Sequence, residues 1–204
     1  MDAQLRNTIL LALEQSDYLS SGNIRDLGLM FCGAKPAVYI LPGDAITANL
    51  VEAAARGGYA TERWRDPLFG PQVVAGDPVC VREVAALCRD LRALSSARQE
   101  RLGRLLGYPA SAATWFAHRA TEGFGNPGTW TPDERRFLLC AFPRDPAGLA
   151  LGRAWAGHLL ASFTEAYGQE AVARLPYAEF PESVVTSSGR PAPVWIRPSL
   201  VYQG

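Results

Sequence analysis

One long helical pattern limits what this chain can fold into more than any other feature. It covers residues 146–167, where large apolar side chains recur every four residues. These side chains are Leu151, Trp155, Leu159 and Phe163. The spacing places them along one face of a helix, and that face must pack against other elements to leave water. Residues 2–16 and 79–93 carry continuous apolar stripes with the same period. We predict helices over all three spans.

Shorter apolar runs in the first third of the chain favour strands. The expected strands are Leu27–Cys32, Ala37–Leu41 and Tyr59–Arg65, with short edge strands at Gln72–Val74 and Val194–Ile196. Further helices are expected after Asp44, over about 96–106 and 110–121, and from Thr131 onward. We therefore expect an α+β fold dominated by helices, with a small sheet in the N-terminal third and a helical middle and C-terminal part.

The length of 204 residues suits a single core, so we expect one domain over residues 1–204. The alternative is a subdivision near residue 77, with an α/β part over 1–77 and a mainly helical part over 78–204.

The charge balance argues against nucleic acid as a partner. Twenty basic and twenty acidic residues give a formal net charge of zero, whereas proteins that bind nucleic acid usually carry a basic excess. Nineteen of the basic residues are Arg and one is Lys35, a usage typical of GC-rich coding, as in actinobacteria. No apolar run approaches the ~20 residues that cross a bilayer, and the first residues do not resemble a signal peptide. We expect a cytoplasmic protein that does not bind membranes.

The four cysteines are scattered, without a CxxC pair, and we expect all of them to be reduced. Cys80 and Cys88 share the apolar face of the predicted helix 79–93, so we expect both to be buried. Eight residues of helix separate them by about 12 Å, which is too far for a disulfide. Cys140 is expected in the core. Cys32 is the best candidate for a reactive thiol, although packing is its favoured role.

Several kinds of chemistry lack their motifs in this sequence. It contains no GxGxxG fingerprint after a predicted strand, no GxxxxGK[ST] loop, no GxSxG elbow and no HExxH pair. The two histidines, His118 and His158, are forty residues apart and have no clustered Cys or Asp, which makes a zinc site improbable. A pyridoxal site would need Lys35. We expect no metal and no cofactor, so that any enzyme here works with its own side chains.

The best candidate site lies on the predicted helix after Pro109. Its face carries Ser111, Trp115, His118 and Glu122. A Glu four residues from a His can orient the imidazole and raise its basicity, as a general base requires. Arg119 beside them can bind an anion, and Trp115 can contact a substrate. The alternative is an ordinary surface His–Glu pair at a helix end.

A second candidate site follows the predicted strand Ala37–Leu41. Asp44 can act there as an acid or base, although the alternative role of helix cap is favoured. On the next predicted strand, Tyr59, Arg63 and Arg65 alternate with period two, so they can share one face and bind a carboxylate or sulfate. A solvated edge strand is the alternative there.

The segment Leu105-Leu106-Gly107-Tyr108-Pro109, followed by Trp115-Phe116, resembles the LGYP signature of a prokaryotic family without a characterised activity. Members of that family place a cysteine pair just after the proline and a second cysteine-containing segment further on, where this chain has Cys140. Here Ala110, Ser111 and Ala112 follow the proline, so the cysteine pair is missing. The resemblance implies a common scaffold more than a common activity.

Two hypotheses from different classes follow. The first is a cofactor-independent enzyme of specialised metabolism that acts on a small anionic substrate by elimination, cyclisation or isomerisation. In it His118 is the base, Glu122 its orienter, and Arg63, Arg65 and Arg119 bind the anion. The second is a non-catalytic accessory or binding subunit that associates with a partner protein or with a second copy. Convergence of His118 and the strand arginines on one pocket favours the enzyme, and scatter over the surface favours the subunit.

Overall fold

The computed structural model describes residues 2–16, 18–67, 70–89, 95–119, 131–137, 142 and 145–175. Helices dominate this part of the chain, and a small antiparallel sheet lies in its N-terminal half, which confirms the predicted α+β class. The helices are α1 Ala3–Gln15, α2 Tyr18–Phe31, α3 Ala45–Arg56, α4 Pro78–Cys88, α5 Ser96–Leu105, α6 Ala110–Arg119, α7 Pro132–Phe137, α8 Pro146–Tyr167 and α9 Gln169–Ala173. The strands are β1 Ala37–Ile40, β2 Ala60–Asp66 and β3 Gly70–Gly76.

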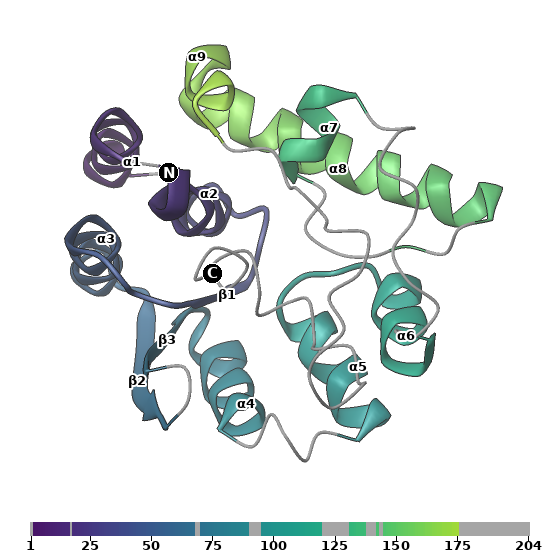
Figure 1. Ribbon diagram of the computed structural model, residues 1–204. Coiled ribbons are helices and arrows are strands. Elements are labelled where there is room, and N and C mark those ends of the chain that lie inside the picture. The colour runs from purple at the N-terminus through teal and green to yellow at the C-terminus, as the bar shows by residue number, and fades with distance from the viewer. Residues whose placement is uncertain are drawn as a thin grey trace.

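The sheet has the strand order β1-β3-β2, with both pairs antiparallel, and helices cover its two faces (Figure 1). One face carries Arg63, which pairs at 2.6 Å with Glu52 of α3. The other face carries Glu62 and Trp64, and Arg89 at the end of α4 contacts both of them. The sheet is therefore a middle layer between α3 and α4.

The prediction of an edge strand at Gln72–Val74 is wrong. These residues belong to β3, which is the central strand and pairs with both of its neighbours. Gln72, Val73, Val74 and Ala75 are all buried, as expected for a strand that helices cover on both faces.

The prediction of a strand at Leu27–Cys32 is also wrong, because this run lies mostly in the last part of α2, which ends at Phe31. Successive apolar side chains are buried all round this helix rather than on one stripe; they are Leu27, Leu29, Met30 and Phe31. Gly28 completes the packing, since the aromatic ring of Phe163 on α8 comes close to its backbone. A short apolar run has no period that separates a buried helix from a buried strand.

The three helices predicted from their apolar stripes are confirmed within the described residues. The predicted positions on α1 and most of those on α8 are buried. Helix α4 ends at Cys88, and residues 90–93 of the predicted span lie outside the described part. The predicted strand Val194–Ile196 also lies outside it. None of the helices described is long and apolar enough to traverse a bilayer.

Two buried arginines connect helix ends that are far apart in the sequence. Arg25 of α2 donates from Nη1 to the carbonyl of Arg136 near the end of α7, at 3.0 Å. Arg136 in turn donates to the carbonyl of Leu175, just after α9. Each guanidinium thus satisfies a carbonyl near the negative end of a helix dipole. Apolar side chains from before and after residue 77 form one cluster, and the number of domains stays a prediction.

Cys32, Cys80 and Cys88 are free thiols, as predicted, and Cys140 lies outside the described residues. Cys88 is buried, but the predicted burial of Cys80 is wrong, because it is only half-buried in the first turn of α4. The buried stripe of α4 consists of Val81, Val84, Ala85 and Cys88. It is rotated by about one residue from the predicted stripe.

Candidate functional site

The segment with the LGYP resemblance forms the turn between α5 and α6. Gly107 has a φ of +83° there, and a Cβ atom at this position would lie 2.7 Å from Cδ of Pro36. Tyr108 packs on Trp155 of α8, with 5.4 Å between ring centroids. The ammonium of Lys35, which is buried, lies 5.0 Å from the centroid of the Tyr108 ring. The segment is thus a packing junction that fixes how the α5–α6 pair sits on the core.

His118 lies on α6, next to the contact of this helix with α5, and its side chain faces solvent. Its side chain is 55% exposed, and its Nε2 is 3.8 Å from Oε2 of Glu100 on α5. This distance is within reach of an ion pair but longer than a hydrogen bond. The carboxylate nearest to His118 among the described residues therefore comes from a neighbouring helix.

Glu100 is held by further contacts with α5 and α6. Its Oε1 accepts a hydrogen bond from Nη2 of Arg104, one turn further along α5. The hydroxyl of Thr114 can donate its single proton to Glu100 or to the carbonyl of Ala110, which lies 2.9 Å away. The Thr114 hydroxyl, then Arg104, and to a smaller extent the charge of His118, hold the pKa of Glu100 below its ordinary value. Glu100 is thus a carboxylate across the neutral range.

The remaining predicted residues of the α6 site are only partly described. Ser111 is exposed, and Trp115 is half-buried against the core. The backbone of Arg119 ends α6, but its side chain lies outside the described part. Glu122 also lies outside it, and so does the glycine-rich segment 123–130. The predicted pairing of His118 with Glu122 therefore stays a prediction.

Asp44 is the N-cap of α3. Its Oδ1 accepts from the backbone N–H of Thr47 at 2.8 Å, and its Oδ2 accepts from the Thr47 hydroxyl at 2.7 Å. Both carboxylate oxygens thus bind the first turn of the helix, which is the cap role favoured from the sequence.

The structure does not bring the arginines of β2 to His118. Arg63 and Arg65 lie on β2, and Figure 1 shows α4 and α5 between that strand and α6. The guanidinium of Arg63 is occupied by Glu52. Tyr59, just before β2, is partly buried against Phe31, with 5.3 Å between ring centroids. Arg65 is exposed. These predicted residues therefore do not share a site with His118.

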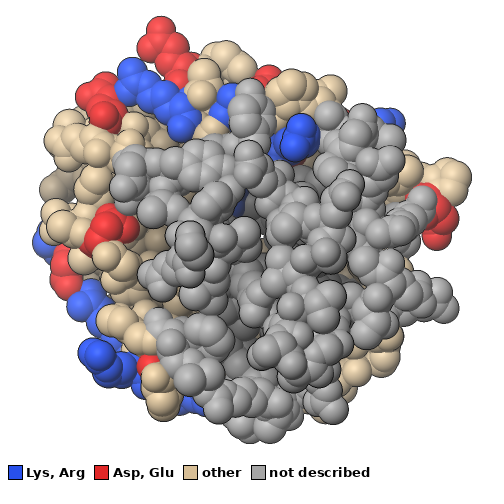
Figure 2. All heavy atoms as spheres, in the orientation of Figure 1, with Lys and Arg blue, Asp and Glu red and all other residues tan. Residues whose placement is uncertain are grey.

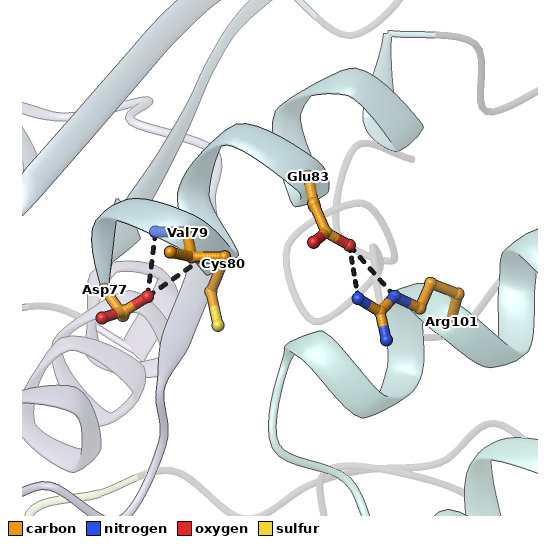
Figure 3. Close-up of polar contacts among 5 residues, drawn as sticks. All are labelled: Asp77, Val79, Cys80, Glu83 and Arg101. Carbon is orange, nitrogen blue, oxygen red and sulfur yellow. Dashed lines mark hydrogen bonds and ion pairs between the residues drawn. The ribbon is translucent and has the colours of Figure 1, made fainter.

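The sequence did not indicate the contact of His118 with Glu100, because the two residues lie far apart in the chain. Glu100 lies 18 positions before His118, and nothing local indicates that α5 and α6 pair at this register. Arg101, the next residue of α5, pairs with α4 instead, as Figure 3 shows. There Nη2 of Arg101 pairs at 2.7 Å with Glu83 of α4, whose N-cap, Asp77, accepts from the backbone N–H groups of Val79 and Cys80.

Within the described residues, no group of three His, Cys, Asp or Glu side chains is placed to hold a metal ion. Basic and acidic side chains lie close to one another along the rim of the face in Figure 2, in keeping with the net charge of zero. Comparison with protein families, with curated proteins and with solved structures finds no match to this chain.

Proposed function

We propose that the protein acts on a small anionic substrate by acid–base chemistry, with His118 as the general base on the α5–α6 face. The proposal rests on the environment of His118. Its imidazole is open to solvent, and an ionised carboxylate that is itself held in place lies 3.8 Å away. An accessible imidazole next to a fixed carboxylate suits proton abstraction, because the carboxylate stabilises the imidazolium that forms.

The proposed substrate contacts are Trp115 and Arg119, which lie on the same helix as His118. Arg63, Arg65 and Tyr59 are left out of this site, since β2 lies away from α6. Asp44 is left out as well, because both of its carboxylate oxygens bind Thr47. The reaction type remains an elimination, cyclisation or isomerisation, which needs a base and an anion-binding group but no redox partner.

The separation of His118 from the β2 arginines favours a second candidate function, that of a non-catalytic accessory or binding subunit. In that case His118 is an ordinary exposed residue of the α5–α6 pair. The two candidates differ in one measurable respect, which is whether a small anion binds next to His118.

Nuclear magnetic resonance of the histidine rings tests this difference, because the chain has only two histidines. Inorganic phosphate, sulfate, malonate, citrate and a set of phosphate monoesters are titrated into the ¹⁵N-histidine-labelled protein. The enzyme proposal expects at least one anion to shift the signals of His118 with saturation and to leave those of His158 unchanged. Arg119→Ala removes this binding, and Arg63→Ala, the matched control on β2, keeps it. Saturable shifts that survive Arg119→Ala, or an absence of shifts at His118, favour the accessory subunit.

A further inference from the structure

We propose that Glu100 is the positioning residue of His118, and that it holds the Nε2 side of the ring so that Nδ1 is left to accept the proton of the substrate. The proposal rests on the function proposed for His118. It changes the expected architecture of the site, since the orienting carboxylate comes from the neighbouring helix rather than from Glu122 on the chain that continues α6.

The two oxygens of Glu100 have different tasks. Oε1 binds Arg104 on the same helix, and Oε2 faces Nε2 of His118 at 3.8 Å. Arg104 follows Glu100 by four residues, so the pair lies along one face of α5. A carboxylate that is anchored at one oxygen presents the other in a restricted direction, as an orienting group must.

The helices that carry the pair are themselves fixed. On α5 the buried side chains include Leu102 and Leu105, and on α6 they include Ala112, Ala113 and Ala117. Small alanines on α6 let the two helices approach closely, and the Gly107 turn seats both of them on Pro36. The register between Glu100 and His118 is therefore set by packing and not by the pair itself.

The charge state of Glu100 suits this role. Hydrogen bonds from Thr114 and Arg104 keep the pKa of Glu100 low, so it stays ionised wherever an imidazole changes charge. An ionised carboxylate beside Nε2 favours the tautomer with its proton on Nε2, and it leaves Nδ1 as the basic nitrogen.

On α5 the charged groups that face His118 are Glu100 and, through it, Arg104. The side chain of Arg119, next to His118 on α6, lies outside the described residues. The effect of the Glu100 carboxylate on the His118 ring must therefore be distinguished from the effect of removing any negative charge from this surface. Glu83→Gln supplies the matched control, since Glu83 is a partly exposed carboxylate on α4 that pairs with Arg101 of α5.

The test compares the histidine ring signals of the wild-type protein with those of Glu100→Gln, Glu122→Gln, Glu83→Gln and Glu100→Asp. In Glu100→Gln we expect the Nε2–H tautomer of His118 to become less populated. Glu100→Asp restores part of this effect, while Glu122→Gln and Glu83→Gln leave His118 as in the wild type. The signals of His158 serve as the internal control in every variant.

Two results overturn the proposal: unchanged His118 signals in Glu100→Gln, or an equal or larger change in Glu122→Gln. The Glu100 side chain is 22% exposed and glutamine keeps its size and shape, so we expect the variant to fold, and urea unfolding verifies this. The measurement needs no substrate, so it is separate from the function proposed above. If anions fail to reach His118 while the Glu100 effect is present, the enzyme proposal fails and only the structural coupling of the two residues stands.

Discussion

Arg25 shows most clearly how one residue joins distant parts of this chain. Its side chain is 4% exposed, and it binds the carbonyl of Arg136 across 111 positions of sequence. Replacing it with Met keeps the apolar stem but leaves that buried carbonyl and Asp26 without their donor. We expect Arg25→Met to lower the free energy of unfolding by about 2–4 kcal/mol, measured by urea titration.

The matched control for Arg25→Met is Arg63→Met, because Arg63 makes an equally direct ion pair with Glu52 in which both side chains are 51% exposed. Exposed pairs of this kind contribute less than about 1 kcal/mol. If the two substitutions cost the same, the Arg25 contact does not stabilise the junction of α2 and α7.

Gly28 is required by the approach of α8 to α2. A Cβ atom there would lie 2.7 Å from Cε2 of Phe163, whose ring is fully buried. We expect Gly28→Ala to destabilise the protein by about 1–3 kcal/mol through overpacking, although alanine favours helix by about 1 kcal/mol. Gly157→Ala on α8 meets no atom within 4 Å, so we expect it to stabilise the protein slightly. Equal signs in thermal unfolding of the two variants would contradict this difference.

At the scale of the element, substitutions at the N-cap of α3 can distinguish a structural role of Asp44 from a catalytic one. Asp44→Ala removes the acceptors of the Thr47 backbone N–H and of its fully buried hydroxyl side chain, so we expect a loss of about 1–2 kcal/mol. Asp44→Asn keeps one good acceptor and should restore most of that stability in urea unfolding. A chemical role for Asp44 predicts a different result, in which the asparagine variant is stable but loses all turnover.

Elements with complete local signals could be predicted from the sequence. Helix α8 covers the span predicted from its apolar stripe, and in the structure Asp145 caps its first turn. The end of α2 and the central position of β3 depend instead on what covers them. Most of Leu27–Cys32 lies in a helix surrounded by other elements, and Gln72–Val74 is covered on both faces. Local sequence contains no information on that burial.

The candidate site was only partly predictable for the same reason. His118 was proposed from its own helix, where spacing indicates which residues share a face. Its observed partner, Glu100, is brought close by the packing of α5 on α6, and the register of two helices depends on buried contacts along their whole length. The anion-binding role of Arg63 was predicted from strand alternation, which indicates its face but not that Glu52 lies opposite.

For the whole molecule, the buried ionisable groups determine how stability depends on pH. Burial raises the pKa of the Cys88 thiol from 9.0 to about 12. In the unfolded chain this thiol loses its proton above about pH 9, whereas in the folded protein it stays protonated until about pH 12. The unfolded state therefore binds fewer protons in this interval, and the free energy of unfolding falls as the pH rises, by about 1.4 kcal/mol per unit for one group.

Tyrosines whose pKa is raised by burial act in the same direction at higher pH, Tyr39 and Tyr167 most strongly. Desolvation raises the pKa of Tyr39 and of Tyr167, so each adds to the loss of stability once unfolded tyrosines ionise, above about pH 10. We expect the urea midpoint to be flat from pH 7 to 8.5 and to fall steeply from pH 9 to 11. Cys88→Ala should make the decline in the free energy of unfolding between pH 9 and 10 shallower, by up to about 1.4 kcal/mol per pH unit. The buried control Val84→Ala on the same helix face lowers stability equally at every pH. A decline in Cys88→Ala as steep as in the wild type would mean that the thiol reaches water in the folded protein, and α4 would then not be closed against the sheet at Cys88.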